Sequence, residues 1–468
     1  MKITERIFKT SIIYFIGQVF AKLVSFILLP LYTNYVNVSD YGYYDLTVSL
    51  LGVAVPVLFL ELWTGTLRFA LEGKDDDERR KVINNAIIII FACTILYSVC
   101  FFGTFLVIRF EYAAWVYLYS IMWVIQLMYL SIARAYSQNA LYASSGVISV
   151  IANTIASIIV VFISNGHIAS LYVGMCTAFI CQAFIINRKV NVVKNFKISD
   201  YDKNLCVELV KFSFPLSLNS IINWLLEGCN KLIITGVLGS AANGIYAVGS
   251  RVSTILNLFV TVFLLSWQES LFRINESDDK DAIYNTCINT FLKTVGACLV
   301  LLLPFIKFIF PFMIGDEYKE VYGLIPLLLL SVYMNSLHGV IAPLFAAEKQ
   351  TKYSMYNKIY MSLTNLIVMY FAINRIGIYA SPIALILAYL VGIFVQLIYA
   401  KKFVAIKIEK KHILIFLIMY LAAMYLYYTK SMIVNAIWFI FAIGIYLFYL
   451  KDFIKGILDI AKSILFKK

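Results

Sequence analysis

The chain has 468 residues, of which 62% are hydrophobic and only 14% are charged, whereas an ordinary soluble domain is nearer half apolar and a quarter charged. A soluble fold of this length cannot bury so much apolar surface, so the composition excludes an ordinary water-soluble protein. The net charge of +13 would suit nucleic acid, but the basic residues lie between long apolar runs, and we expect no nucleic-acid partner.

Apolar runs long enough to cross a bilayer, about 20 residues each, follow one another along the chain. We predict about fourteen spans, the first of them retained because no signal-peptide cleavage site follows it. The predicted fold class is therefore an all-α polytopic membrane protein. The runs begin near Ser11, Gly42, Val82, Ala113, Ala140, Ile168, Phe212, Ala242, Thr290, Val321, Tyr353, Ile378, Ile413 and Met432.

Lysine and arginine are distributed unevenly between alternate connections. With the N-terminus in the cytoplasm, the cytoplasmic segments hold 30 of the 39 basic residues. The outer loops hold only Arg109, Lys319, Arg375 and Lys430. Because positive charge marks the cytoplasmic side of membrane proteins, we predict that both termini are cytoplasmic.

An internal repeat relates the segment from Lys9 to the segment from Lys211, with Gly42 aligned on Gly244 and Tyr44 on Tyr246. Six spans separate the copies, so the two halves share one orientation in a parallel pseudo-repeat. We predict a six-helix lobe at 1–190, a second at 191–402, and accessory helices 13 and 14 with an amphipathic tail at 403–468. The tail suits an interfacial helix.

Polar and charged residues inside the spans are costly and need a reason. The seventh span carries a polar stripe at four-residue spacing, and basic residues occur in the first, second and eighth spans. Together these groups predict a cationic cavity for a phosphate or pyrophosphate. The basic residues are Lys22, Arg68, Lys231 and Arg251, and the polar lining is Gln18, Asn219, Asn223 and Asn230.

The same charges are also compatible with structural roles. Each basic residue could instead be a snorkelling side chain or part of a structural ion pair. Glu227 is a candidate for coupling transport to H⁺ or Na⁺, or it could neutralise Lys231 one helical turn away. We interpret His338 as a packing residue.

No catalytic motif is present, and the acidic run from Asp75 to Glu78 is interpreted as a solvated loop. The eight cysteines are scattered without a CxxC pair, and there are only three histidines. We therefore predict no metal and no cofactor. A secondary transporter, driven by a gradient rather than by nucleotide hydrolysis, fits better than an enzyme.

The segment LLPLYTNYVNVSDYGYYDL (Leu28–Leu46), the element GTLRFALEG around Arg68 and the second copy LGSAANGIYAVGSRV resemble the polysaccharide-transporter family of the MOP superfamily, the Wzx-type flippases. The resemblance implies two six-helix lobes around a cationic cavity in the bacterial cytoplasmic (inner) membrane. It implies translocation of an undecaprenyl-diphosphate-linked glycan, such as an O-antigen or capsule unit, to the outer leaflet, with polysaccharide assembly proteins as partners. It supports Lys22, Arg68, Lys231 and Arg251 only as basic positions in cavity-lining helices.

Three further functions stay open as alternatives. A multidrug/Na⁺ antiporter or a lipid II flippase of the same superfamily would share the fold, although the basic cavity disfavours drug export. A membrane-embedded glycan polymerase would need a sizeable outer loop, which the sequence lacks.

Overall fold

The computed structural model describes residues 26, 28–73, 75–274, 279–429 and 431–451, and within these residues the chain is helical and has no strand. It divides into two compact units, Met1–Gly244 and Ile245–Lys468. This division is not the same as the predicted lobes at 1–190, 191–402 and 403–468, whose boundaries stay a prediction. Gln18 and Lys22 lie outside the described residues.

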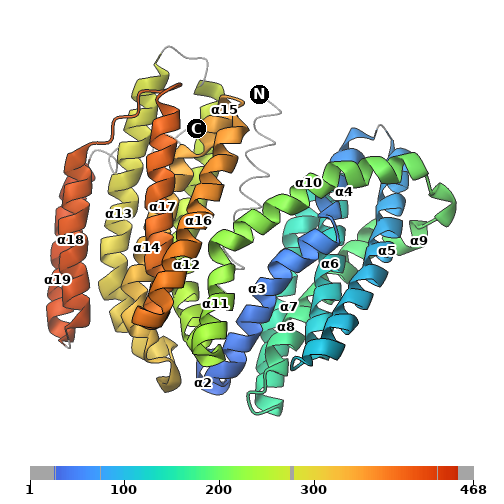
Figure 1. The fold of residues 1–468 in the computed structure, drawn as a ribbon, viewed down its shortest axis with the longest axis horizontal. Helices are drawn as coiled ribbons and strands as arrows, with labels where there is room; N and C mark the ends of the chain where they lie inside the picture. The colour runs from blue at the N-terminus through green and yellow to red at the C-terminus, as the bar shows by residue number, and fades with distance from the viewer. Residues whose placement is uncertain (1–25, 27, 74, 275–278, 430, 452–468) are drawn as a thin grey trace, which may run out of the picture. The chain divides into compact units, whose positions relative to one another are not determined.

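The first unit contains the helices from α2 to α11 and the start of α12 (Figure 1). Their bounds are α2 (Leu29–Tyr35), α3 (Val38–Leu58), α4 (Leu62–Glu72), α5 (Asp76–Ile108), α6 (Ala113–Ala135), α7 (Asn139–Ile163), α8 (Ala169–Val190), α9 (Val192–Asn195), η1 (Ile198–Asp200), α10 (Lys203–Glu227), α11 (Cys229–Leu238) and α12 (Ser240–Ile274).

The second unit contains the rest of α12 and the helices that follow. They are α13 (Lys280–Met313), η2 (Asp316–Tyr318), α14 (Val321–Ile341), α15 (Pro343–Ala347), α16 (Thr351–Ile376), η3 (Gly377–Tyr379), α17 (Ala380–Ala400), α18 (Lys410–Tyr428) and α19 (Met432–Tyr449).

Eleven stretches of the described chain are helical, long and apolar enough to cross a bilayer. Large apolar side chains such as Leu106, Phe394 and Phe448 are exposed along them, as expected where lipid covers the protein. The protein is therefore a multi-pass membrane protein. The count of fourteen spans stays a prediction: one stretch, Lys352–Ala400, holds both α16 and α17, and α12 is not among the eleven.

Two predicted spans are broken helices. The second span is divided into α3 and α4 just after Pro56, where Leu60 and Glu61 both adopt left-handed conformations, with φ of 56° and 50°. Such conformations are uncommon for residues other than glycine. The seventh span is divided into α10 and α11 at Gly228. Breaks within transporter helices free backbone groups and provide points at which a helix can bend.

The acidic run at Asp75 forms a helix start rather than the predicted loop. The Asp75 carboxylate accepts a hydrogen bond from the Glu78 amide at 2.7 Å and caps α5, whose first turn contains Asp76, Asp77 and Glu78. Negative charge is favourable at a helix N-terminus because it opposes the positive end of the helix dipole. The run therefore has a structural role.

In each unit, an asparagine side chain binds the backbone of a connecting segment at two points. We call each of these contacts a clasp. In the first unit, the Asn85 side chain donates to the Asp200 carbonyl and accepts from the Asp202 amide, both at 2.8 Å. In the second, Asn289 does the same to the Lys407 carbonyl and the Glu409 amide, both at 2.9 Å. Each clasped segment leads directly into a long helix, α10 or α18. The local structure therefore repeats at nearly the spacing that the sequence repeat predicts.

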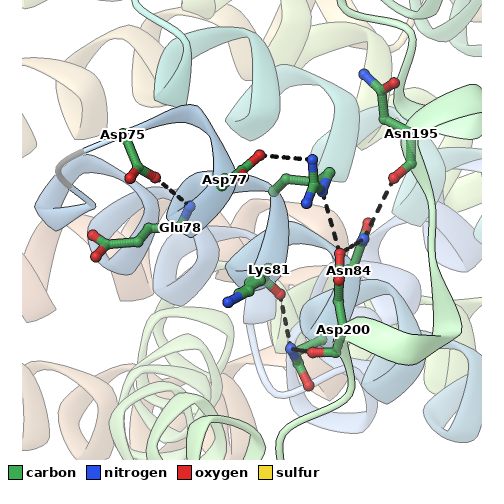
Figure 2. A network of polar contacts seen from close by, with 9 residues as sticks. Asp75, Asp77, Glu78, Lys81, Asn84, Asn195 and Asp200 are labelled. Atoms are coloured by element: carbon green, nitrogen blue, oxygen red, sulfur yellow. Dashed lines mark hydrogen bonds and ion pairs between the residues drawn. The ribbon is translucent and has the colours of Figure 1, made fainter.

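Figure 2 shows the polar contacts around the first clasp. The Asp200 carboxylate accepts hydrogen bonds from the Asn84 amide at 2.7 Å and from Arg80 Nε at 3.3 Å. Desolvation alone would raise the pKa of Asp200, but these two hydrogen bonds outweigh it, and the pKa lies below its ordinary value. Asp200 is therefore ionised at neutral pH and holds the segment before α10 to the start of α5.

Helix α18 packs closely within the second unit. Phe416 stacks on Tyr333 with ring centroids 4.2 Å apart. The ammonium of Lys307, which is buried, donates to the Tyr427 carbonyl at 2.7 Å and to the Thr429 carbonyl. A cation at the C-terminal end of a helix satisfies carbonyls that have no partner within the helix, so Lys307 caps α18.

Candidate functional site

An ion pair joins α11 to α3 within the first unit. The Lys231 ammonium lies 2.8 Å from one carboxylate oxygen of Asp45 and 3.0 Å from the other. Both side chains are largely covered, with 9% of the Asp45 side chain and 23% of the Lys231 side chain exposed. Opposite charges held together in a membrane reduce the cost of burying either one. Lys231, predicted as a cavity cation, is thus already paired with a carboxylate.

Two glycines allow α3 and α12 to cross at very close range beside this ion pair. A Cβ added at Gly42 would lie 1.8 Å from the Ser240 carbonyl oxygen, and one added at Gly244 would lie 2.2 Å from the Val38 carbonyl oxygen. Gly42 and Gly244 are equivalent in the sequence repeat, as are Val38 and Ser240 at the same offset. The contact is therefore reciprocal, with each repeat placing its glycine on a carbonyl of the other.

Asn243 adds a hydrogen bond to this contact between α3 and α12. Its amide donates a hydrogen bond of 2.7 Å to the Gly42 carbonyl, and its side chain is fully buried. We call the contact formed by Asp45, Lys231, Gly42, Asn243 and Gly244 the crossing.

The polar stripe of the seventh span is divided by the helix break. Asn219, Asn223 and Glu227 are exposed on α10, whereas Asn230 is buried on α11. On another side of α10, Trp224 Nε1 donates to the Ser49 hydroxyl at 3.3 Å, which attaches the helix to α3. The structure thus presents three of the predicted polar residues on one exposed face.

Glu61 is an acid at a helix break that is absent from the predicted site. It lies at the break between α3 and α4, where its carboxylate accepts hydrogen bonds of 3.4 Å from the hydroxyls of Ser220 and Thr64. Asp45 is absent from the predicted site as well. Both acids stand among aromatic and apolar residues, and Lys231 and Ser220, which contact them, are distant in sequence. A count of charges within the second span would have found them.

The two arginines of the predicted cavity lie in different units. Arg68, on α4, is exposed, pairs with Glu72 at 3.3 Å and places its guanidinium 4.7 Å from the centre of the Phe212 ring on α10. Arg251 is half-buried on the part of α12 that belongs to the second unit. A single cavity formed by Arg68, Lys231, Arg251 and Lys22 stays a prediction. Among the described residues, no group of three or more His, Cys, Asp or Glu side chains could hold a metal ion.

A comparison with the sequence models of protein families shows the family of this chain. Residues 7–267, more than half of its length, match the sequence model of a family described as "Polysaccharide biosynthesis protein". The chain belongs to this family. The resemblance predicted from Leu28–Leu46 and the Arg68 element is thereby confirmed.

Solved structures of transporters share the fold of this chain. Lipid II flippase MurJ in an inward closed conformation superposes with a TM-score of 0.64 at 16% identity, covering 95% of this chain and 99% of that chain. An inward-facing multidrug resistance MATE family transporter of the MOP superfamily gives 0.61 at 11% identity, covering 83% and 95%. A MOP superfamily transporter from Pyrococcus furiosus gives 0.56 at 14% identity, covering 85% and 96%. No curated protein matches the chain by sequence. The all-helical MOP-type fold class is confirmed.

Proposed function

We propose that this protein is a flippase that moves a polyprenyl-diphosphate-linked oligosaccharide from the cytoplasmic to the outer leaflet of the bacterial inner membrane. The observation that carries the proposal is the combination of a polysaccharide-biosynthesis family match with a MOP-type transporter fold. The proposed substrate class, an O-antigen, capsule or related repeat unit, is the one that the resemblance implies, and the family description supports a role in polysaccharide synthesis.

The diphosphate is the part of the substrate that basic side chains can bind. Lys22, Arg68, Lys231 and Arg251 are the proposed binding residues, since lysine supplies a point charge and arginine a two-pronged donor to phosphate oxygens. Lys231 is paired with Asp45 at 2.8 Å, so a diphosphate that reaches Lys231 must compete with that carboxylate. Substrate binding would then weaken the ion pair.

The crossing is the proposed closure on the outer side. In the predicted topology, α3 begins and α11 ends near the outer surface, so Asp45 and Lys231 lie toward that side. Releasing the pair when the diphosphate binds would allow the outer side to open, with Gly228 and the Leu60–Glu61 break as bending points. Glu227 and Glu61 are the proposed carboxylates for coupling to H⁺ or Na⁺.

The direct test is flipping in proteoliposomes that contain the purified full chain. A labelled undecaprenyl-diphosphate oligosaccharide should move between leaflets at least tenfold faster than in protein-free vesicles. Arg251→Gln should abolish this gain, whereas Arg109→Gln, a basic residue of a predicted outer loop, should preserve it. Equal flipping by wild type and Arg251→Gln would contradict the proposed site, and no flipping by wild type would contradict the function.

A lipid II flippase is the second candidate. The match to MurJ covers 95% of the chain, whereas the MATE match covers 83%, so more of this chain's fold is shared with the lipid II flippase. Lipid II and a MATE substrate such as ethidium, supplied to the same vesicles, distinguish the three functions. Faster movement of lipid II than of the oligosaccharide would identify peptidoglycan precursor transport, and ethidium movement alone would identify a drug exporter.

A further inference from the structure

The segment that connects α8 to α10 carries five basic residues and two acids, and both acids accept hydrogen bonds within the protein. We call residues 188–203 the basic strap. Its two acids are engaged by the protein: Asp200 accepts from Asn84 and Arg80, and Asp202 caps α10 by accepting from the Asn204 amide at 2.8 Å. Its basic side chains are all exposed, namely Arg188, Lys189, Lys194, Lys197 and Lys203. The outer surface of the strap is therefore cationic.

Large apolar side chains stand between these cations. Val193 is 69% exposed and Ile198 is 76% exposed, and Phe196 and Tyr201 are exposed as well. Alternating lysines and exposed apolar groups are typical of a segment that lies at a membrane surface, where the apolar groups enter the acyl boundary and the cations contact head groups.

The strap is held in one position rather than loosely tethered. Asn85 binds its backbone at Asp200 and Asp202, and the Asn84 amide also lies 3.5 Å from the Asn195 carbonyl (Figure 2). Figure 1 shows α9 at the edge of the first unit, beside the first turns of α5. The segment that carries the four apolar side chains is thus held in place, and Val193 and Ile198 remain mostly exposed, at 69% and 76%.

The basic strap lies near a bilayer surface because of the two helices that it connects. It connects α8 and α10, both of which are long and apolar enough to span a membrane. Residues 191–202 are too few to carry the segment far from the ends of these two helices. A lipid surface is therefore the nearest covering for Val193 and Ile198, whichever way the protein is oriented.

We propose that the basic strap is an interfacial anchor that inserts Val193, Phe196, Ile198 and Tyr201 into the head-group region and binds anionic phospholipid through its lysines. The partner is the anionic lipid of the membrane that the protein spans. The proposal does not depend on what the protein transports.

The experiment places a spin label on the strap of the full-length protein. In a background whose eight cysteines are replaced, Ile198→Cys is labelled and reconstituted into vesicles of phosphatidylcholine alone or with 30% phosphatidylglycerol. The label at position 198 should be several-fold more accessible to oxygen than to a water-soluble nickel chelate, and more so with phosphatidylglycerol. Gln138→Cys, exposed in the turn between α6 and α7, is the control and should remain accessible to nickel.

A charge variant tests the anionic lipid separately. Lys194→Gln with Lys197→Gln should remove the effect of phosphatidylglycerol at position 198, whereas Lys349→Gln with Lys352→Gln, an equal loss of charge outside the strap, should not. A label at 198 as accessible to nickel as the one at 138 in both vesicles would overturn the proposal and favour a soluble protein partner. Insertion that is equal in both vesicles would overturn the role of anionic lipid.

Discussion

The residues of the crossing show how a membrane protein can keep a lysine inside the bilayer. A lone charge there costs about 2.5 to 3.5 kcal/mol on insertion scales, and Asp45 offsets that cost for Lys231 from 2.8 Å away. The same pairing restricts Lys231, because any other anion must displace the carboxylate first. Lys231 is a free cation by its sequence alone, but in the folded chain it is held in an ion pair with Asp45.

Removing the carboxylate should therefore have two effects. Asp45→Asn leaves the Lys231 ammonium without its ion pair, and we expect a loss of roughly 3 kcal/mol in stability together with a shift toward an outward-open state. Thermal unfolding in detergent measures the first effect, and labelling of an engineered cysteine by an impermeant thiol reagent measures the second. The charge swap Asp45→Lys with Lys231→Asp should recover part of both.

A matched control comes from an exposed ion pair. Asp316→Asn breaks the pair with Lys319, whose side chains are 90% and 72% exposed, and exposed pairs contribute at most about 1 kcal/mol. If the Asp45 and Asp316 variants behave alike, Asp45 does not close the protein.

At the same scale, the sequence locates charges but not their partners. Lys231 is recognisable as a cation in an apolar run, whereas its partner is 186 residues away and no local periodicity connects the two. The expectation that Glu227 could neutralise Lys231 stays a prediction, and the two residues lie on different helices, α10 and α11, on either side of Gly228.

At the scale of helices and connecting segments, two kinds of contact involve the backbone directly. α3 and α12 touch through Gly42 and Gly244, and asparagine side chains attach extended segments in both units. The sequence repeat predicts that Gly42 and Gly244 are equivalent, and the structure places them against each other. Hydropathy predicts most spans, but it does not reveal the break at Leu60, because left-handed residues other than glycine leave no apolar pattern.

Gly42→Ala should destabilise the crossing. The added Cβ would meet the Ser240 carbonyl at 1.8 Å, and forcing the helices apart costs about 1 to 3 kcal/mol. Gly52→Ala, ten residues further along α3, meets nothing within 4 Å and should be neutral or slightly stabilising. Thermal unfolding of the two variants decides the point, and equal melting temperatures would show that the helices do not touch as described.

The two clasps should be separable. Asn85→Ala leaves a partly buried carbonyl and a partly buried amide without their partner, a cost of up to about 3 kcal/mol. Hydrogen exchange should therefore accelerate in residues 196–204 but not in 405–411. Asn289→Ala should show the opposite pattern, and the exposed Asn374→Ala should change neither. Acceleration of both segments by one variant would contradict independent clasps.

At the scale of the whole molecule, the family and the fold class can be predicted from the sequence. How closely the last two helices pack against the rest of the second unit cannot. Predicted as accessory, α18 is bound into the second unit by Phe416, Tyr420 and the Lys307 cap. Hydropathy does not reveal this, because aromatic residues that pack against α13 and α14 look the same as those that face lipid. The substrate likewise cannot be predicted, because sugar recognition leaves no motif that resembles a charge or a repeat.

Deleting residues 405–468 should therefore destabilise the second unit. Buried surfaces of Tyr333 and Lys307 would be exposed to lipid, and we expect a lower yield of folded protein in size-exclusion chromatography. Removing 452–468 alone keeps α18 and α19 and should leave the yield unchanged. A stable, monodisperse protein after the longer deletion would support the accessory assignment.

The asparagine clasps have a consequence for how the family can diversify. Asn85 and Asn289 hold the segments through backbone amides and carbonyls, and every residue except proline supplies both groups. The Asn85 side chain also accepts a hydrogen bond from the Cys206 thiol. Exposed side chains of the held segment, such as Ile198, can therefore be replaced without loosening its attachment. Asp200 is an exception, because Asn84 and Arg80 bind its carboxylate. The exposed surface of the segment after α8 can thus vary in sequence while Asn85 keeps its backbone in place.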